Sequence, residues 1–447
     1  MQICIILFFF ICTFIIYAQG NADHIINEKL TNFVFLSCNH QKGKKNETLF
    51  KSIEKMKPQI MLWIGDYFYS ECKELICLEE AYEEIKNDLL YKDIKKKFKI
   101  DGIYDDHDYN KNNGDKLYEH KKISKAKFLE YLGVDKSDVR YKRDGSYVSK
   151  LYIDPDNEKN QVKIIILDTR YNKDPYPFYA PDSYDDSYIS IIVSFFSRFY
   201  ATLFGLNCNS GNDILGKKQW EWLQRELTNS NARSHIIISS IQFFSNFFVN
   251  ENWGLMPHAL ARLKALIKKT KPKGLLFLSG DVHYSGIFGN EDNVVEVTSS
   301  GVNQANMFSP INKYLIYIFT ALFNKRTAVD YNKIYAFNNF GSVNINYVDD
   351  DNIEIKTTVH NSNGEKMLVV NQVFNDKKDV YSDTEKLHVI NDEFGTLMCK
   401  SPLLITVHFI IHLLILLLFF ELLYITFKLF CFKGYKYGKS SKHIKTK

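Results

Sequence analysis

The 447-residue sequence has little proline, nine residues in all, and no stretch rich in proline, glycine and serine divides it into parts. It also lacks a strong charge of either sign, because 57 Lys and Arg stand against 52 Asp and Glu. The missing linker favours one large domain over separate modules. The net charge of +5 gives no reason to expect a nucleic-acid partner. Six lysines of this small excess lie in residues 433–447, which contain no acid.

Both ends of the chain carry long apolar runs. Residues 1–20 lack the basic start of a typical signal peptide, but the run ends in Ala18-Gln19-Gly20, a small-x-small cleavage pattern. We expect a signal peptide there, with an uncleaved anchor as the alternative. Residues 402–427 are long enough to cross a bilayer, and the lysine-rich tail (428–447) that follows predicts a cytoplasmic C-terminus. The sequence therefore predicts a single-pass type I membrane protein of the secretory pathway, with residues 378–401 as a polar stalk.

Five cysteines fall in the part of the chain that we expect outside the cytoplasm: Cys38, Cys72, Cys77, Cys208 and Cys399. An odd number in an oxidising compartment implies at least one thiol with another use. Cys72 and Cys77 are close enough in sequence to pair, and we expect a disulfide between them.

Two further side-chain sets invite a functional interpretation. Asn46-Glu47-Thr48 is an N-glycosylation sequon, so a glycan is expected on Asn46. His408 and His412 share one face of the expected membrane helix; they are either a ligand pair or neutral histidines tolerated in the span.

Short apolar strands and helical segments alternate through the first two thirds of the chain. Strands are expected at 33–38, 59–66, 147–153, 162–170, 235–240 and 275–281, and helices at 48–56, 79–98, 217–227 and 259–269. Such alternation indicates an α/β fold. From residue 293 the pattern becomes strand-rich, which predicts a mixed sheet that completes the same domain, over residues 30–377.

Two apolar inserts, 188–206 and 313–326, interrupt this pattern. The first carries Arg198 near its middle, a charge that a membrane-spanning helix would have to bury. We expect each insert to lie on the membrane or over the rim of the active site. A core helix is the alternative.

Polar side chains suited to metal or proton chemistry follow the apolar strands. Ligands gather at the carboxyl ends of strands in open α/β sheets, and so many carboxylates at one edge would repel one another unless cations neutralised them. Mixed donors of this kind suit iron, zinc or manganese, and oxygen-rich ones suit calcium or magnesium. The residues are Cys38, Asp66, Tyr69, Asp105, Asp106, His107, Asp108, Asp168, Arg170, Asp281 and His283.

Each of these residues also has a plainer interpretation. Cys38 could be a buried free thiol and Tyr69 a packing residue. Asp168 and Arg170 could form an internal salt bridge, and Asp108 is better explained as a cap than as a ligand.

The segments "WIGDYFY", "YDDHDYNKNNGD", "ILDTRY" and "LSGDVHYS" follow one another in the order typical of the PhoD-like (alkaline phosphatase D type) family. The chain resembles this family, part of the calcineurin-like metallophosphatases, over roughly residues 33–345. The resemblance implies a sandwich of two mixed β-sheets flanked by helices and a metal cluster, with iron and calcium suggested and zinc, manganese or magnesium as alternatives. The bacterial members' N-terminal β-sandwich is missing here.

Carried over by position, the resemblance implies roles for most of the strand-end residues. Asp66 is the expected bridge between two metals, and His107 is the expected catalytic histidine that assists the leaving group. Asn110 and Asn113 depart from the family, which tends to have Gly and Asp there. The implied metal-site residues are Cys38, Asp66, Tyr69, Asp105, Asp106, Asn112, Asp281 and His283.

The sequence thus predicts a membrane-anchored metallophosphoesterase in which a metal-bound hydroxide attacks phosphorus in line. Arg170 would stabilise the charge on the phosphoryl oxygens, and His107 would protonate the leaving oxygen. The expected substrate is a small phosphate ester. The rivals are a phospholipase-type diesterase acting on lipids, a non-catalytic surface protein that retains the fold, and a lipid-binding surface module.

Overall fold

The computed structural model describes residues 22–70, 72, 74–176, 188–208, 211–228, 230–245, 250–289, 294–305, 334–377, 399 and 401–440. The expected signal peptide, the apolar insert at 313–326 and nearly all of the expected stalk lie outside these residues.

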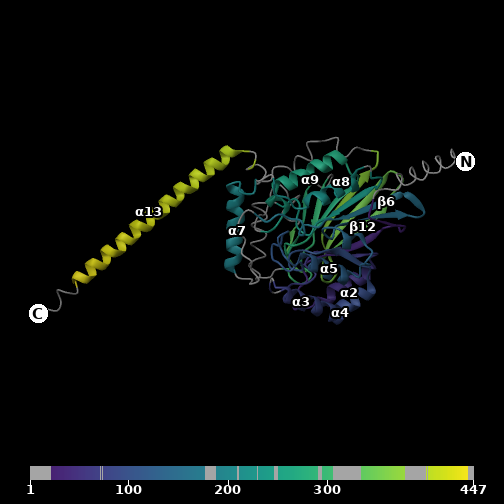
Figure 1. The fold of residues 1–447 in the computed structure, drawn as a ribbon, viewed down its shortest axis with the longest axis horizontal. Coiled ribbons are helices and arrows are strands. Elements are labelled where there is room, and N and C mark those ends of the chain that lie inside the picture. Colours follow the sequence, from purple (N-terminus) through teal and green to yellow (C-terminus); the bar gives the residue numbers. More distant parts are fainter. Residues whose placement is uncertain are drawn as a thin grey trace.

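Two mixed β-sheets form the centre of the described part of the chain (Figure 1). Each sheet combines a run of neighbouring parallel strands with antiparallel strands. The predicted sandwich of two mixed sheets flanked by helices is confirmed. The first sheet runs β14 (Lys366–Asn375), β13 (Asn352–Asn361), β12 (Asn339–Tyr347), β2 (Asn32–Leu36), β3 (Met61–Ile64), β4 (Ile100–Ile103). The second runs β1 (His24–Ile26), β5 (Val148–Asp154), β6 (Asn157–Ile166), β7 (Ser234–Ile238), β8 (Leu275–Ser279), β10 (Val295–Thr298), β9 (Ser285–Gly289), β11 (Ile334–Tyr335).

The central strands are apolar on both faces because both faces are covered. On β7, Ile236 and Ile238 pack into the core between the sheets, whereas Ile237 packs beneath α8 (Gly216–Leu227) and α9 (Pro257–Thr270). On β2, Phe33 and Phe35 face the other sheet. Alternate residues of that strand pack against helices on the opposite side (Figure 1).

The helices on this opposite side are α2 (Glu47–Met56), α3 (Leu75–Asn87), α4 (Leu89–Lys97), α5 (Lys121–Leu132) and the short α6 (Val139–Lys142). The single helix expected over 79–98 is wrong, because the chain breaks at Asp88. That residue takes an extended conformation, and its side chain accepts a hydrogen bond from the backbone N–H of Leu90, 2.8 Å away. Aspartate is a strong N-cap, so a second helix begins there.

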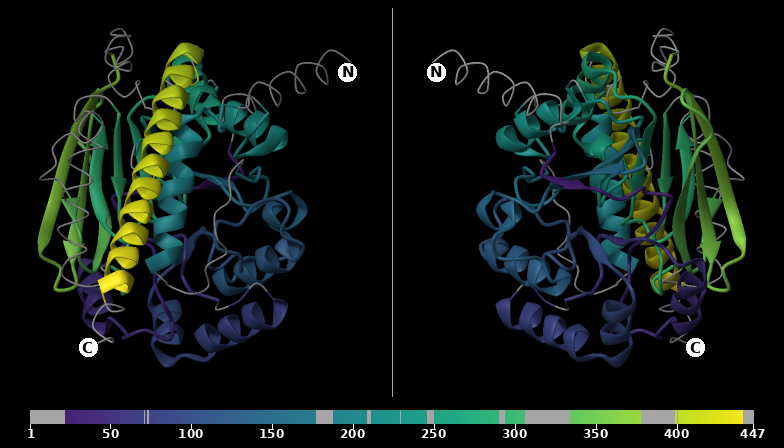
Figure 2. Two further views of the ribbon diagram at one scale, coloured as in Figure 1. Left: turned by 90° about the vertical axis from the view of Figure 1, so that its left-hand side faces the viewer. Right: turned by 90° about the vertical axis from the view of Figure 1, so that its right-hand side faces the viewer.

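Two helices lie outside this sandwich. The insert forms α7 (Tyr188–Leu203), and the C-terminal run forms α13 (Pro402–Ser440), which carries the helix into the expected tail. Residues 402–428 of α13 are long and apolar enough to cross a membrane. Figure 1 shows α7 between the domain and the first turns of α13, after which α13 slants away, and the left view of Figure 2 shows α13 in front of α7. A disulfide joins Cys208, just after α7, to Cys399, just before α13. A short 3₁₀ turn, η1 (Trp253–Leu255), precedes α9.

Candidate metal centre

The carboxyl ends of β2, β3, β4 and β8 meet at one edge of the sandwich. Two glycines permit the close approach. A Cβ on Gly280 would lie 2.6 Å from Ser37 Oγ and 2.7 Å from the carbonyl oxygen of Ile64, and one on Gly65 would lie 2.7 Å from Asp105 Cβ. Residues that immediately follow strands of the two different sheets are therefore in contact.

This approach gathers the predicted ligands into two groups that share Asp66. The donor atoms of Cys38, Asp66 and His283 lie within 4.8 Å of one another, and so do those of Asp66, Asp105, Asp106 and Asp281. Asp66 also groups with Asp106 and His107. A carboxylate common to both groups is placed as a bridge between two cations requires.

The electrostatics of the cluster fit bound cations. Burial, and after it the neighbouring Asp106 and Asp105, raises the pKa of Asp66 well above its ordinary value. Burial raises the pKa of Asp281 in the same way, with Asp105 and Asp106 adding to the effect. Asp105 Oδ2 and Asp106 Oδ1 are buried without a hydrogen-bond partner. Positive charge between these carboxylates would supply the missing partner and favour their ionised forms.

Four of the expected ligands have left-handed backbone conformations. The φ angles are 59° at Cys38, 50° at Asp66, 73° at Asp281 and 60° at His283. Residues other than glycine rarely adopt positive φ, and such strain gathers at functional sites. Each strand therefore ends in a sharp turn that directs its ligand toward the same point.

The softer donors lie on one side of Asp66. Cys38 is a free, buried thiol whose Sγ lies 3.0 Å from Ser300 Oγ and 3.6 Å from Asp66 Oδ2. The hydroxyl of Tyr69 lies 3.0 Å from His283 Nε2 and 3.4 Å from Asp66 Oδ2. Tyr69 is therefore part of the cluster rather than of the distant core, and burial raises its pKa well above the ordinary value. Burial lowers the pKa of His283 to about 4, which favours the neutral, metal-binding imidazole.

His107 is half-buried at the edge of the cluster. Its backbone N–H donates to Asp66 Oδ1 at 3.3 Å, and its ring centroid lies 4.1 Å from that of Tyr69. These contacts place the imidazole beside the metal ligands. Asp108 accepts hydrogen bonds from the backbone N–H groups of Asp105 and Tyr67, so it caps the turn that carries the ligands.

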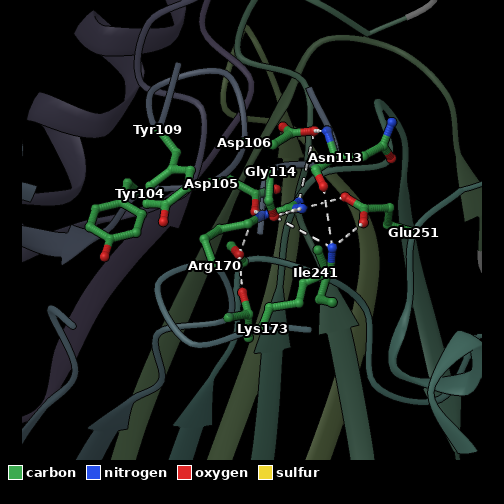
Figure 3. A network of polar contacts seen from close by, with 12 residues as sticks. Tyr104, Asp105, Asp106, Tyr109, Asn113, Gly114, Arg170, Lys173, Ile241 and Glu251 are labelled. Atoms are coloured by element: carbon green, nitrogen blue, oxygen red, sulfur yellow. Dashed lines mark hydrogen bonds and ion pairs between the residues drawn. The ribbon is translucent and has the colours of Figure 1, made fainter. Parts of the chain in front are cut away.

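Arg170 is fully buried in a network that reaches the cluster (Figure 3). Its Nε donates to Asp105 Oδ1 at 2.5 Å, and its Nη1 lies 2.5 Å from Glu251 Oε2. Nη2 has no hydrogen-bond partner and lies 3.9 Å from Asp106 Oδ2. The alternative of a salt bridge from Asp168 to the Arg170 guanidinium is wrong. Asp168 accepts from backbone N–H groups, including that of Arg170 itself.

Sequence reasoning missed Glu251 and Lys173. Glu251 Oε1 lies 3.3 Å from Lys173 Nζ, and both side chains are buried. Burial opposes ionisation of Glu251, but Arg170, Lys173 and Arg198 outweigh it and lower its pKa. Glu251 follows no strand or helix pattern, so nothing in the sequence connected it with Arg170. Lys173 could have been found from its place on the loop that carries Arg170.

The asparagine-rich loop after His107 closes the other side of the cluster. Asn113 donates its backbone N–H to Asp106 Oδ2 at 2.8 Å, and its Oδ1 accepts a hydrogen bond from Arg198 on α7 at 2.6 Å. Asn110 and Asn113 have φ angles of 73° and 56°, which asparagine tolerates better than most residues other than glycine. The expected ligand Asn112 lies half-buried beside Asn113 on this loop.

The expected disulfide between Cys72 and Cys77 is confirmed, so these thiols are not metal ligands. It closes a loop next to the cluster, since the carbonyl of Glu74 accepts a hydrogen bond from Asn110 Nδ2 at 3.1 Å. Cys38, in contrast, is in neither disulfide and is a free, buried thiol.

The sequon has a structural role that the sequence did not suggest. Asn46 Oδ1 accepts a hydrogen bond from the N–H of Leu49 and caps α2, while Nδ2, the atom that a glycan would occupy, donates to Val302 O at 2.7 Å and Ser362 Oγ at 2.9 Å. Glycosylation would replace one of the two hydrogens on Nδ2, so at least one of these hydrogen bonds would be lost. The structure therefore speaks against the expected glycan.

Comparisons with known proteins show the family and the fold. The family model of the PhoD-like phosphatases matches residues 80–355. Among solved structures, the chain is similar to PhoD, with 15% identity over 84% of this chain and 79% of that chain and a TM-score of 0.53. A dimetal phosphatase from Danio rerio has 9% identity over 78% of this chain and 99% of that one, with a TM-score of 0.40. None of the curated proteins matches the chain in sequence.

Proposed function

The chain belongs to the PhoD-like phosphatase family, and we propose that it hydrolyses phosphate esters with a cation pair held at the cluster around Asp66. The observation that carries this proposal is the shared carboxylate: Asp66 belongs both to the group with Cys38 and His283 and to the all-carboxylate group. Two cations bridged in this way can neutralise the attacking and the leaving oxygen of a phosphoryl group.

The two groups suit different cations. Cys38 and His283, with Tyr69 beside them, offer sulfur, nitrogen and phenol donors, which suit iron, zinc or manganese. Asp105, Asp106 and Asp281 offer oxygen only, which suits calcium or magnesium. In line with the family, we propose iron in the first position and calcium in the second. Bound cations would supply positive charge next to the phosphoryl oxygens and lower the pKa of a water molecule there.

The side chains around the cluster would supply proton transfer and stabilise the charge of the phosphoryl oxygens. The ring of His107 lies at the half-buried edge, where it can give a proton to the leaving oxygen. Arg170 holds Asp105 through Nε and has Nη2 left for a phosphoryl oxygen. Glu251 holds Arg170 from the other side. The buried network thus fixes both the ligand and the guanidinium before substrate arrives.

The replacement Asp281→Asn tests this function, because it keeps the shape of a ligand and removes its charge. We expect the variant to lose turnover of an aryl phosphate and of a bis-aryl phosphate while its circular dichroism stays unchanged. Asp350→Asn is the matched control, since the side chain of Asp350 is 74% exposed and its ion pair with Lys159 is long, at 3.7 Å. Full activity of the Asp281→Asn enzyme would refute the proposed centre.

A lipid phosphodiester is the second candidate substrate. One observation favours it: α7 contacts both the loop that carries the metal ligands, through Arg198 and Asn113, and the candidate membrane helix α13. Rates on a phosphomonoester, a phosphodiester and a phospholipid in one buffer separate the candidates. A chain that binds no metal and hydrolyses none of them across added calcium, magnesium, manganese, zinc and iron would instead be a non-catalytic surface protein.

The long apolar helix α13 is compatible with a membrane anchor. We propose that residues 402–427 span the membrane and that the phosphatase domain, residues 30–377, lies on the lumenal or extracellular side, with the basic tail in the cytoplasm. The two disulfides support this orientation, because disulfides persist in oxidising compartments.

A further inference from the structure

We propose that α7 inserts into the same membrane leaflet as the first turns of α13, so that the domain docks on the bilayer through α7. The occupant of the exposed face of α7 would be lipid acyl chains. This inference goes beyond phosphate-ester hydrolysis, because it concerns a surface that no catalytic step uses.

The C-terminal half of α7 packs on the beginning of α13. The ring of Tyr200 lies 5.5 Å from that of His412, and the ring of Phe204 lies 5.7 Å from His412 and 6.0 Å from Phe409. Just after the helix, Gly205 is in contact with Ile405, since a Cβ there would lie 2.6 Å from Ile405 Cδ1. From Tyr200 to Gly205 the partners on α13 shift from His412 to Ile405, so the two segments run in opposite directions where they touch. Beyond this contact α13 slants away from α7 (Figure 1).

These contacts reach to membrane depth. His412 lies ten residues beyond Pro402, where α13 begins. At 1.5 Å per residue this is about 15 Å along the helix, or half of a hydrocarbon core about 30 Å thick. If α13 spans the bilayer, the helix that packs on its first three turns lies at the level of the acyl chains or the headgroups.

The apolar and the charged side chains of α7 lie on different sides of the helix, as contact with lipid requires. Val193, Phe196 and Tyr200 share one face and are 37%, 48% and 37% exposed. Arg198 is 6% exposed and bonds to Asn113 of the domain. Apolar side chains thus face outward while the charged one is buried in protein, which is the arrangement expected of a helix in contact with lipid.

A covalent tether keeps the two helices together. Cys208 lies five residues after Leu203, and Cys399 three residues before Pro402. Three extended residues span at most about 11 Å. The disulfide therefore holds the end of α7 near the start of α13, and Tyr200, on the exposed face of α7, contacts His412 of α13.

Docking through α7 would set the position of the metal centre. Arg198 bonds to Asn113, which in turn donates to Asp106. The loop with the metal ligands is thus one contact away from the helix that we place in the membrane. The role of that loop rests on the proposed function, whereas the insertion of α7 does not.

Tryptophan quenching in vesicles tests the insertion. The four native tryptophans, Trp63, Trp220, Trp222 and Trp253, are at most 3% exposed, so a quencher in the lipid leaves them bright. The full chain with Phe196→Trp is reconstituted into phosphatidylcholine vesicles with and without bromine on the acyl chains. We expect the added fluorescence to be lost in the brominated vesicles, and Val193→Trp to behave alike.

Val348→Trp is the control. Val348 is 53% exposed, and the carbonyl of the next residue, Asp349, bonds to Arg233 at the start of β7, opposite the metal centre. Its fluorescence should not change with bromination. Equal, unquenched fluorescence at positions 196 and 348 would overturn the inference. Because no turnover is measured, that result would leave the proposed hydrolysis of phosphate esters untouched.

Discussion

Replacing Glu251 by Gln should destabilise the fold although it hardly changes the shape of the side chain. Glu251 is 3% exposed and lies 2.5 Å from Arg170 and 3.3 Å from Lys173, both fully buried. The variant leaves two buried cations with one close partner, Asp105. Breaking a buried pair in this way costs about 3–5 kcal/mol. We take the lower end because Asp105 still holds Arg170, so the ratio of folded to unfolded chain should fall about a hundredfold.

Denaturant unfolding of the full chain in detergent, followed by tryptophan fluorescence, measures this loss. The matched control is Glu221→Gln, because Glu221 is exposed on α8 and lies 3.9 Å from Lys217 four residues earlier. An exposed pair of this kind contributes about 0.3–0.5 kcal/mol, so the control should unfold almost as the unchanged protein does. Equal unfolding midpoints for the two variants would refute the assignment of Glu251 as the counter-ion of the buried network.

Three further predictions concern other parts of the fold. Burial opposes ionisation of Asp101, but Lys150 and Arg140 outweigh it and lower its pKa to about 2, from 3.8. Its contribution of about 2 kcal/mol is complete above pH 4 and is lost as the pH falls toward 2, so Asp101→Asn should flatten that part of the acid-unfolding curve; an unchanged curve would contradict this. His107→Ala should lower kcat about 10²–10⁴-fold, and more for esters with poor leaving groups; an equal loss for all leaving groups would exclude the role of proton donor. Non-reducing peptide mapping should show Cys208 joined to Cys399 and an unmodified Asn46, whereas alkylation of both cysteines or a glycan on Asn46 would contradict the structure.

The layers of the fold could be predicted from the sequence because they follow from short-range patterns. Strands such as "LLFLS" of β8 have four consecutive apolar residues because both of their faces are covered. Their boundaries and partners depend on single capping groups, which is why the break at Asp88 was missed. The sheet order could be expected only through the family resemblance.

In the candidate site, too, residues that follow a short-range pattern could be predicted, whereas residues that depend on long-range contacts could not. Asp66, Asp281 and His283 could be found because each lies within four residues of the end of a buried strand, where an unpaired polar group is costly. Glu251 and the disulfide from Cys208 to Cys399 could not, because they depend on contacts between segments far apart in the chain. The role of Asn46 as a helix cap could not be predicted from its sequon. A sequence motif identifies the atom that would be modified, but not the hydrogen-bond partners of that atom in the fold.

The metal content of the purified full-length chain tests the central claim most directly. Elemental analysis should find two metal ions per chain, and Asp66→Asn should lower the content of both metals because Asp66 belongs to both ligand groups. Asp350→Asn should retain the full content. A chain that hydrolyses phosphate esters without bound metal, or an Asp66→Asn variant with its full complement of metal, would contradict a cation pair bridged by Asp66.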